Sequence, residues 1–325
     1  MDPARVWYGR HPLSLVLLPL SWLYCAVVHA RRLAYRAGWF ARRRLPVPVV
    51  VVGNLTVGGT GKTPLVLELA TLLRARGWTP GILTRGYGGT ARVWPQLVTA
   101  DSDPRLVGDE SVLLARRSGC TLVAGPDRVS SGELAIRLGG CDILLSDDGL
   151  QHYRLARDLE IALVDGERGL GNGRCLPAGP LREPRGRLAS VDLVLQREGP
   201  PGADRMRLVP GQAVNLRRPE IRRPLADFVG RPVQALAGIG YPERFFAVLR
   251  SAGLDLVTRV YPDHHPFSPA DARDWGAGPV IMTEKDAVKC QAFAGDDHWY
   301  LPVAAELDDA FVARFFSKLA GSNHG

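Results

Sequence analysis

Two hydrophobic patterns alternate along most of this chain. Short runs of consecutive apolar residues, typical of strands buried on both faces of a parallel sheet, alternate with segments of helical periodicity. Between residues 45 and 195 the expected strands are Val47–Val52, Thr79–Thr84, Thr121–Ala124, Asp142–Ser146, Glu160–Val164 and Val191–Leu195. The helices expected between them are Thr63–Arg76, Asp109–Arg117 and Val129–Leu138. This order predicts an α/β fold with a sheet wound by crossover helices.

A second, shorter alternation follows a stretch rich in Pro, Gly and Arg, residues 196–230, which we interpret as a connection. Its expected strands and helices are Val233–Ala237, Glu243–Ala252, Leu256–Tyr261, Pro269–Trp275, Val280–Thr283, Tyr300–Val303 and Asp308–Leu319. The pattern predicts a smaller α/β domain. We therefore expect three parts, residues 1–44, 45–225 and 226–325, with ligand bound between the two α/β domains.

The amino-terminal segment has a different pattern. Leu13–Ala30 is apolar apart from a few residues. Six arginines follow it: Arg31, Arg32, Arg36, Arg42, Arg43 and Arg44. A secretory signal carries its positive charge before the apolar stretch, and a spanning helix needs about 20 apolar residues. We therefore expect residues 1–44 to hold a membrane-associated helix, with arginines against anionic head groups of the cytoplasmic leaflet. A buried core helix with a solvated basic face is the alternative.

The composition indicates an anionic partner but does not identify it. The chain has 325 residues, 46% hydrophobic and 23% charged, and a net charge of +8, which favours nucleic acid, an anionic membrane or a phosphorylated substrate. Because the arginines cluster beside an apolar helix and no nucleic-acid-binding module is visible, we expect a membrane surface and no nucleic acid. The five cysteines are scattered and are interpreted as reduced thiols. No obligate protein partner is evident.

A glycine-rich segment between the first expected strand and helix carries the clearest chemistry. Gly58, Gly59 and Gly61 free the backbone so that its N–H groups can converge on phosphate oxygens at a helix N-terminus. Lys62 can reach the β- and γ-phosphates, and the hydroxyl of Thr63 can ligate Mg²⁺. A turn that only connects strand and helix is the alternative. The residues predicted to bind nucleotide here are Leu55, Thr56, Val57, Gly58, Gly59, Thr60, Gly61, Lys62 and Thr63.

Paired carboxylates follow two other expected elements. Asp147 and Asp148 end an apolar strand, where adjacent ionised groups are readily explained by a cation beside them. A plain Asp-Asp-Gly turn is the alternative. Asp109 and Glu110 open a helix, and capping alone would account for them. Their place between the phosphate loop and the paired aspartates supports a functional role as strongly as the helix start supports capping.

Three further segments place cations or an imidazole at strand ends or in a loop. Arg85 and Tyr87, among glycines, suit an anionic, partly apolar substrate. Arg182 can approach nucleotide phosphates. The sequence Pro262-Asp-His-His offers His264 as a base oriented by a carboxylate, with His265 as the alternative ring.

Taken together, these segments resemble the tetraacyldisaccharide 4'-kinase family of lipid A biosynthesis. The resemblance spans residues from the amino-terminal helix to at least Lys285, and Thr56 matches the family's variant of the phosphate loop. It rests on Gly53-Asn-Leu-Thr-Val-Gly-Gly-Thr-Gly-Lys-Thr-Pro64, Arg85-Gly-Tyr-Gly88, Gly108-Asp-Glu110, Asp147-Asp-Gly-Leu-Gln-His152, Leu181-Arg-Glu-Pro184 and Pro262-Asp-His264.

The resemblance implies an ATP- and Mg²⁺-dependent kinase that phosphorylates the 4'-hydroxyl of an acylated glucosamine disaccharide 1-phosphate at the cytoplasmic face of the inner membrane. It also implies a P-loop NTPase-like sheet. Its residue roles are Asp109 as catalytic base assisted by His264, Glu110, Asp147 and Asp148 organising Mg²⁺, Gln151 and Arg182 near the nucleotide, and Tyr87 near the lipid.

Two other classes fit less well. A membrane-associated P-loop ATPase switch would share the Gly-Gly-x-Gly-Lys-Thr sequence, but its signature Lys is replaced here by Val57. A GTPase would need Asn/Thr-Lys-x-Asp, and Thr283-Glu-Lys-Asp286 has these letters in another order.

Overall fold

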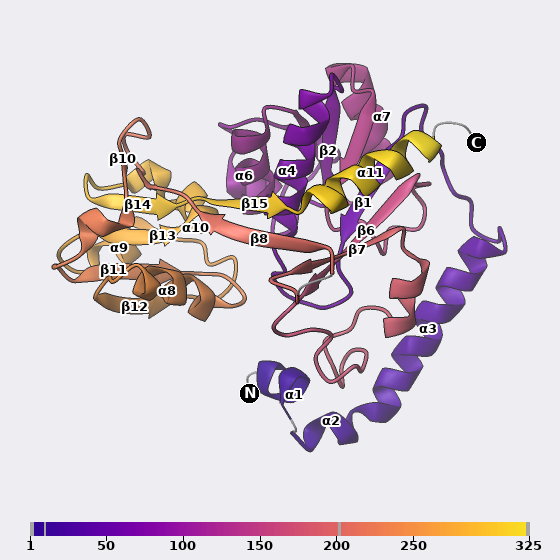
Figure 1. Cartoon of the computed structure of the whole chain (residues 1–325), viewed down its shortest axis with the longest axis horizontal. Helices are drawn as coiled ribbons and strands as arrows, with labels where there is room; N and C mark the ends of the chain where they lie inside the picture. Colours follow the sequence, from indigo (N-terminus) through magenta and orange to yellow (C-terminus); the bar gives the residue numbers. More distant parts are fainter. Residues whose placement is uncertain (1–2, 10, 201–202, 323–325) are drawn as a thin grey trace.

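The amino-terminal segment forms three helices rather than one. The computed structural model describes residues 3–9, 11–200 and 203–322. Its first helices are α1 (Pro3–Tyr8), α2 (Leu13–Val16) and α3 (Leu18–Arg36). Pro19 lies in the first turn of α3, where a missing N–H costs no hydrogen bond, so the expected helix Leu13–Ala30 divides just before it. Figure 1 shows α3 along the outer edge of the molecule.

In the described residues, no helix combines the length and the apolar character that a membrane crossing would require.

A nine-stranded sheet forms the centre of the larger lobe, in the order β15-β8-β7-β6-β1-β5-β2-β4-β3. Strands β1 to β8 are Val49–Gly53, Pro80–Thr84, Gln96–Val98, Thr121–Ala124, Ile143–Ser146, Leu159–Asp165, Leu193–Arg197 and Arg205–Pro210. All pairings among them are parallel except that of β3 with β4. The predicted wound α/β sheet with a large parallel core is therefore confirmed.

Helices cover both faces of this sheet, because its central strands are apolar on both sides. The helices of the larger lobe are α4 (Lys62–Ala75), α5 (Pro104–Val107), α6 (Asp109–Ser118), α7 (Arg128–Gly139) and α11 (Asp309–Ser322). Helices α4, α6 and α11 contribute to one buried cluster, and α7 with Leu45 to the other. Partly buried Tyr24 and Cys25 of α3 also pack against the second cluster.

A six-stranded sheet forms the smaller lobe, in the order β10-β9-β14-β13-β11-β12. Its strands are β9 (Ala213–Asn215), β10 (Arg222–Arg223), β11 (Val233–Ala237), β12 (Leu256–Val260), β13 (Val280–Thr283) and β14 (His298–Leu301). Its helices are α8 (Pro242–Ser251), α9 (Pro269–Arg273) and α10 (Glu284–Cys290). The parallel strands β13, β11 and β12, at one side of this sheet, carry the loops that face the larger lobe.

The division between the lobes differs from the expected parts 45–225 and 226–325. Residues 196–230 are not only a connection, since they contain β8, β9 and β10. Strand β15 (Val303–Leu307) pairs antiparallel with β8, and α11 packs on the larger sheet. Strands β9 and β10 are only three and two residues long, so they show no periodicity, and the pairing of β15 with β8 joins segments far apart in the sequence. Figure 1 shows β8 and β15 running side by side between the lobes.

Candidate active site

The glycine-rich segment lies between β1 and α4, at the carboxyl edge of the larger sheet. Gly58 and Gly61 have φ of +107° and +97°, conformations that favour glycine, and α4 begins directly after Gly61. Lys62 and Thr63 therefore occupy the first turn of a 14-residue helix that begins at this loop. This is the geometry in which backbone N–H groups and a helix N-terminus form an anion site.

The phosphate loop accommodates Thr56 because the backbone at this position is extended and pairs with residues 180–182. It forms an antiparallel bridge with Leu181, and the backbone N–H of Val57 donates to the carbonyl of Pro180 (2.8 Å). The N–H of Arg182 donates to the carbonyl of Leu55 (2.6 Å). Residues 180–182 thus support the first half of the loop and bring the Arg182 side chain to it.

Lys62 and Arg182 share two partners, Asn54 and Asp148, and we call these four residues together with the phosphate loop the phosphate-loop corner. Lys62 Nζ donates to Asn54 Oδ1 (3.0 Å) and lies 3.5 Å from Asp148 Oδ1. Arg182 Nη1 donates to Asp148 Oδ2 (2.9 Å), while its Nη2 donates to the same Asn54 oxygen. Asn54 is fully buried and was not among the predicted site residues, although it follows the β1 strand directly.

The adjacent aspartates differ in charge environment. Burial raises the pKa of Asp147 to about 7, and the negative charge of Glu110 adds to the effect. Burial acts in the same direction on Asp148, but Lys62 and Arg182 outweigh it and hold its pKa well below its usual range. Asp147 Oδ1 is a buried oxygen without a hydrogen-bond partner in the described part of the chain.

This oxygen set fits a divalent cation shared with a phosphate ligand. In residues 3–9, 11–200 and 203–322, no group of three or more His, Cys, Asp or Glu side chains could hold a metal by itself. Mg²⁺ is usually bound by one or two carboxylates together with substrate phosphates and water. The unpartnered Asp147 oxygen beside the phosphate loop is suited to such a shared site, because a cation would relieve its uncompensated burial.

A carboxylate and an imidazole from opposite lobes meet next to this corner. Asp109, the first residue of α6, is 4% exposed, and both its oxygens lie 3.0 Å from His264 Nδ1. His264 follows β12 of the smaller lobe and has a positive φ of 61°. Burial tends to raise the pKa of Asp109, but His264 and two lysines hold it below its ordinary value. The hydrogen bond to Asp109 raises the pKa of His264.

Two lysines of α10 complete this contact between the lobes. Lys285 Nζ donates to Glu110 Oε1 and to Asp263 Oδ1, both at 3.0 Å. It also lies 3.2 Å from His264 Nε2, and Lys289 Nζ lies 3.6 Å from Asp109 Oδ2. These lysines were missed, although Thr283-Glu-Lys-Asp caps a helix at the end of a parallel strand, where neighbouring loops gather.

The other predicted side chains are distributed around this contact. Tyr87 is 61% exposed, and the centroid of its ring lies 5.0 Å from that of the His264 ring. Arg85 is exposed directly after β2. His265 points elsewhere, with its Nε2 3.4 Å from Asp271 Oδ1 and its ring 4.8 Å from that of Tyr261. The structure therefore brings His264, and not His265, to Asp109.

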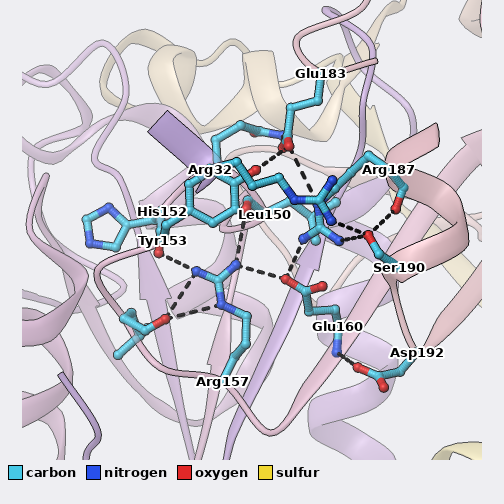
Figure 2. A network of polar contacts seen from close by, with 12 residues as sticks. Arg32, Leu150, His152, Tyr153, Arg157, Glu160, Glu183, Arg187, Ser190 and Asp192 are labelled. Carbon is cyan, nitrogen blue, oxygen red and sulfur yellow. Dashed lines mark hydrogen bonds and ion pairs between the residues drawn. The ribbon is translucent and has the colours of Figure 1, made fainter. Parts of the chain in front are cut away.

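Gln151 connects the phosphate-loop corner to a larger polar network. Its Oε1 accepts from Arg182 Nη1 (3.3 Å), and its Nε2 donates to Glu183 Oε1 (2.9 Å). Glu183 also accepts from the hydroxyl of Tyr153. Figure 2 shows the network continuing through Arg187 and Ser190 to Arg32 of α3. Remaining members of the network in Figure 2 are Leu150, His152, Arg157, Glu160 and Asp192. The corner is thus braced against the amino-terminal helix.

The fold and this corner define a phosphate-loop α/β protein whose second lobe adds a histidine to an aspartate beside the loop. A family model described as tetraacyldisaccharide-1-P 4'-kinase, LpxK, matches residues 13–320, and the chain belongs to this family.

Relatives of the same name align with nearly the whole chain. Tetraacyldisaccharide 4'-kinase of Nitrosococcus oceani is 50% identical over 315 residues, which cover 97% of this chain and 93% of the relative. That of Pseudomonas aeruginosa strain LESB58 is 48% identical over 317 residues, covering 96% and 95%. The crystal structure of "apo" form LpxK from Aquifex aeolicus in complex with ATP has a TM-score of 0.78 and 29% identity, and the match covers 94% of this chain and 99% of that one.

Proposed function

We propose that this protein transfers the γ-phosphoryl group of ATP to the 4'-hydroxyl of an acylated glucosamine disaccharide 1-phosphate in lipid A biosynthesis. Membership of the 4'-kinase family, and the relatives' shared name across almost the full chain, support this activity. The observation within the structure that carries it is the Asp109–His264 pair at the lobe contact, adjacent in sequence to Glu110 and close to the phosphate-loop corner.

ATP binds, in this proposal, at the phosphate loop, residues 55–63. Lys62 and the N-terminus of α4 would attract the phosphate oxygens. Arg182 and Gln151 would support the same phosphates, since both side chains already point to Asn54 or Asp148 at this corner. The structural neighbour from Aquifex aeolicus is a complex with ATP, which supports ATP as the donor.

Thr63, Glu110, Asp147 and Asp148 are the residues that would hold Mg²⁺. Bound there with the nucleotide, the cation would neutralise charge on the transferring phosphoryl group. A cation there would also compensate Asp147, which is buried with an oxygen that has no hydrogen-bond partner in the described residues and lies within the negative field of Glu110.

Asp109 is the proposed base for the acceptor hydroxyl. Its lowered pKa keeps it ionised at neutral pH and able to accept a hydrogen bond from that hydroxyl. His264 occupies the assisting position, because Nδ1 faces Asp109 while Nε2 faces Lys285. Tyr87, exposed beside His264, and Arg85 would contact the lipid acceptor.

The α2–α3 segment is the proposed membrane-docking surface. Apolar side chains on it are exposed, including Leu20, Trp22, Leu23 and Val27, each more than half exposed. Ser21 and Tyr24 on the other side donate hydrogen bonds to the body of the protein, at Cys175 and Arg182. We place the enzyme at the cytoplasmic face of the inner membrane, where such a surface and the adjacent arginines would meet anionic lipids.

Transfer of label from [γ-³²P]ATP tests the function. Purified full-length protein with Mg²⁺ is incubated with the lipid disaccharide 1-phosphate in mixed micelles, or with micelles alone. We expect labelled lipid only with the acceptor, and ADP in equal amount. Release of labelled phosphate at the same rate with and without the acceptor, with no labelled lipid, would instead favour a membrane-associated ATPase switch.

A further inference from the structure

A second set of ionic contacts joins the lobes on the other side of the phosphate loop. Arg244, in the first turn of α8, makes two hydrogen bonds of 2.7 Å to Asp165 at the end of β6. Arg197 Nη2 donates to Asp165 Oδ2 (2.7 Å), and Arg244 also pairs with Glu167. Asp165 is 4% exposed, so this carboxylate depends on its arginines for compensation.

Asp165 also shapes the turn that follows it. Its Oδ1 accepts from the backbone N–H groups of Glu167 (3.1 Å) and Arg168 (3.2 Å). The guanidinium carbon of Arg168 then lies 3.7 Å from the ring centroid of Tyr8 and 4.9 Å from that of Tyr241. Arg168 is therefore held between an aromatic ring of α1 and one of the smaller lobe, an arrangement favoured by cation–π attraction.

Helix α1 is fixed to the same loop by several direct contacts. Trp7 Nε1 donates to the carbonyl of Pro177 (3.1 Å), and the N–H of Asn172 donates to the carbonyl of Trp7 (2.8 Å). A Cβ at Gly171 would meet that carbonyl at 2.8 Å, so the approach is close. Figure 1 shows α1 well separated from the far end of α3. The position of α1 is thus determined by the loop that carries Arg168.

The segment of the smaller lobe that contains Tyr241 and Arg244 also touches the phosphate loop. A Cβ placed on Gly240 would lie 3.9 Å from the backbone nitrogen of Gly59. Arg197, the partner of Asp165, lies near Gly61, since a Cβ there would be 3.4 Å from its Cδ. Displacement of Tyr241 would therefore move backbone that borders the nucleotide site.

We propose that Arg168, held between Tyr8 and Tyr241, is a positioning residue for phosphoryl transfer that makes the reaction depend on α1. Through this contact α1 stabilises the arrangement of the lobes in which His264 reaches Asp109, independently of any contact with the membrane. The proposal rests on the proposed kinase function.

The test compares Tyr8→Ala with Tyr8→Phe in the full-length enzyme. Both are assayed in mixed micelles with saturating lipid disaccharide, so that membrane docking does not limit the rate. Loss of one cation–π contact should lower kcat about threefold to tenfold in Tyr8→Ala. Tyr8→Phe keeps the ring and should keep kcat. Co-sedimentation with phosphatidylglycerol–phosphatidylethanolamine vesicles should be equal for both variants.

Tyr241→Ala removes the second aromatic contact of Arg168, the one with the smaller lobe. Tyr241 is 38% exposed, so its truncation leaves the core intact and decides the question even if Tyr8→Ala does not fold. We expect a loss of kcat at least as large, because the Tyr241 ring also lies 5.0 Å from the guanidinium carbon of Arg244. The double variant should be little worse than Tyr241→Ala alone, because Tyr8 acts through Arg168, which has then already lost its contact with the smaller lobe.

Unchanged kcat in Tyr241→Ala, or losses that multiply in the double variant, would overturn the proposal. So would a Tyr8→Ala defect limited to vesicle binding. A failure of the kinase function itself is distinguishable, since the wild-type enzyme would then give no labelled lipid.

Discussion

The phosphate-loop corner and the α2–α3 surface have opposite physical arrangements. At the corner, Lys62, Arg182 and Asp148 are charged, partly buried and mutually paired around Asn54. On α3, Trp22 and Leu23 are 66% and 64% exposed without a covering element in the described structure. A phosphate site needs dipoles fixed in advance, whereas an interfacial surface needs apolar area left for lipid to cover. The two regions should therefore respond to different substitutions.

Removing the cation of the corner should have the largest effect. Lys62→Met leaves Asp148 without one of its two cations and removes the ammonium group that we propose contacts the phosphates of ATP. We expect kcat/KM for ATP to fall by about 10³-fold or more, with vesicle binding unchanged. Label transfer and vesicle co-sedimentation on the same preparation check this. Equal loss of vesicle binding would show that the two regions are not independent.

His264→Ala should have an intermediate effect. It removes the partner of Asp109 across the lobes but leaves the carboxylate, so kcat should fall about 10- to 100-fold with a small change in ATP affinity. His265→Ala is the matched control, because His265 contacts Asp271 and not Asp109. Steady-state kinetics of both variants decide the assignment, and equal losses would contradict it.

The exposed apolar surface should give a smaller effect of another kind. Trp22→Ser combined with Leu23→Ser should weaken binding to anionic vesicles about tenfold or more and leave turnover in micelles nearly unchanged. Leu138→Ser on α7 is the control, since Leu138 is also exposed (55%) but lies on another helix. If the control weakened vesicle binding as strongly, the surface would have no special role.

The smallest expected effect is on stability against acid. Burial, with the charge of Arg128, lowers the pKa of His152 to about 4, so the folded protein keeps this ring neutral. An unfolded chain takes up the proton below about pH 6.5, so stability is lost as pH falls from 6.5 toward 4. Between pH 7 and pH 5, protonation of this imidazole in the unfolded chain should lower the free energy of unfolding by about 1–2 kcal/mol. Urea unfolding of wild type and His152→Gln should show a smaller acid loss in the variant, and equal losses would contradict this.

The sequence allowed good prediction of the strands and helices of the larger lobe, because buried parallel strands such as Val49–Gly53 are continuous apolar runs. The return of β15 and α11 to the larger sheet was not predictable from periodicity, since strand pairing is a long-range property. For the candidate site, the phosphate loop could be predicted because its residues are contiguous in the sequence. Lys285 was not, because its partners Glu110 and Asp263 come together only when the lobes meet.

The most direct test of the account is single-turnover phosphoryl transfer by Asp109→Asn, with ATP binding measured on the same protein. Asparagine keeps the shape of Asp109 but cannot accept a proton as a base. We predict wild-type ATP affinity and transfer to the lipid acceptor slowed by about 10³-fold. Transfer at a rate near that of the wild type would contradict the assignment of Asp109 as the base at the lobe contact.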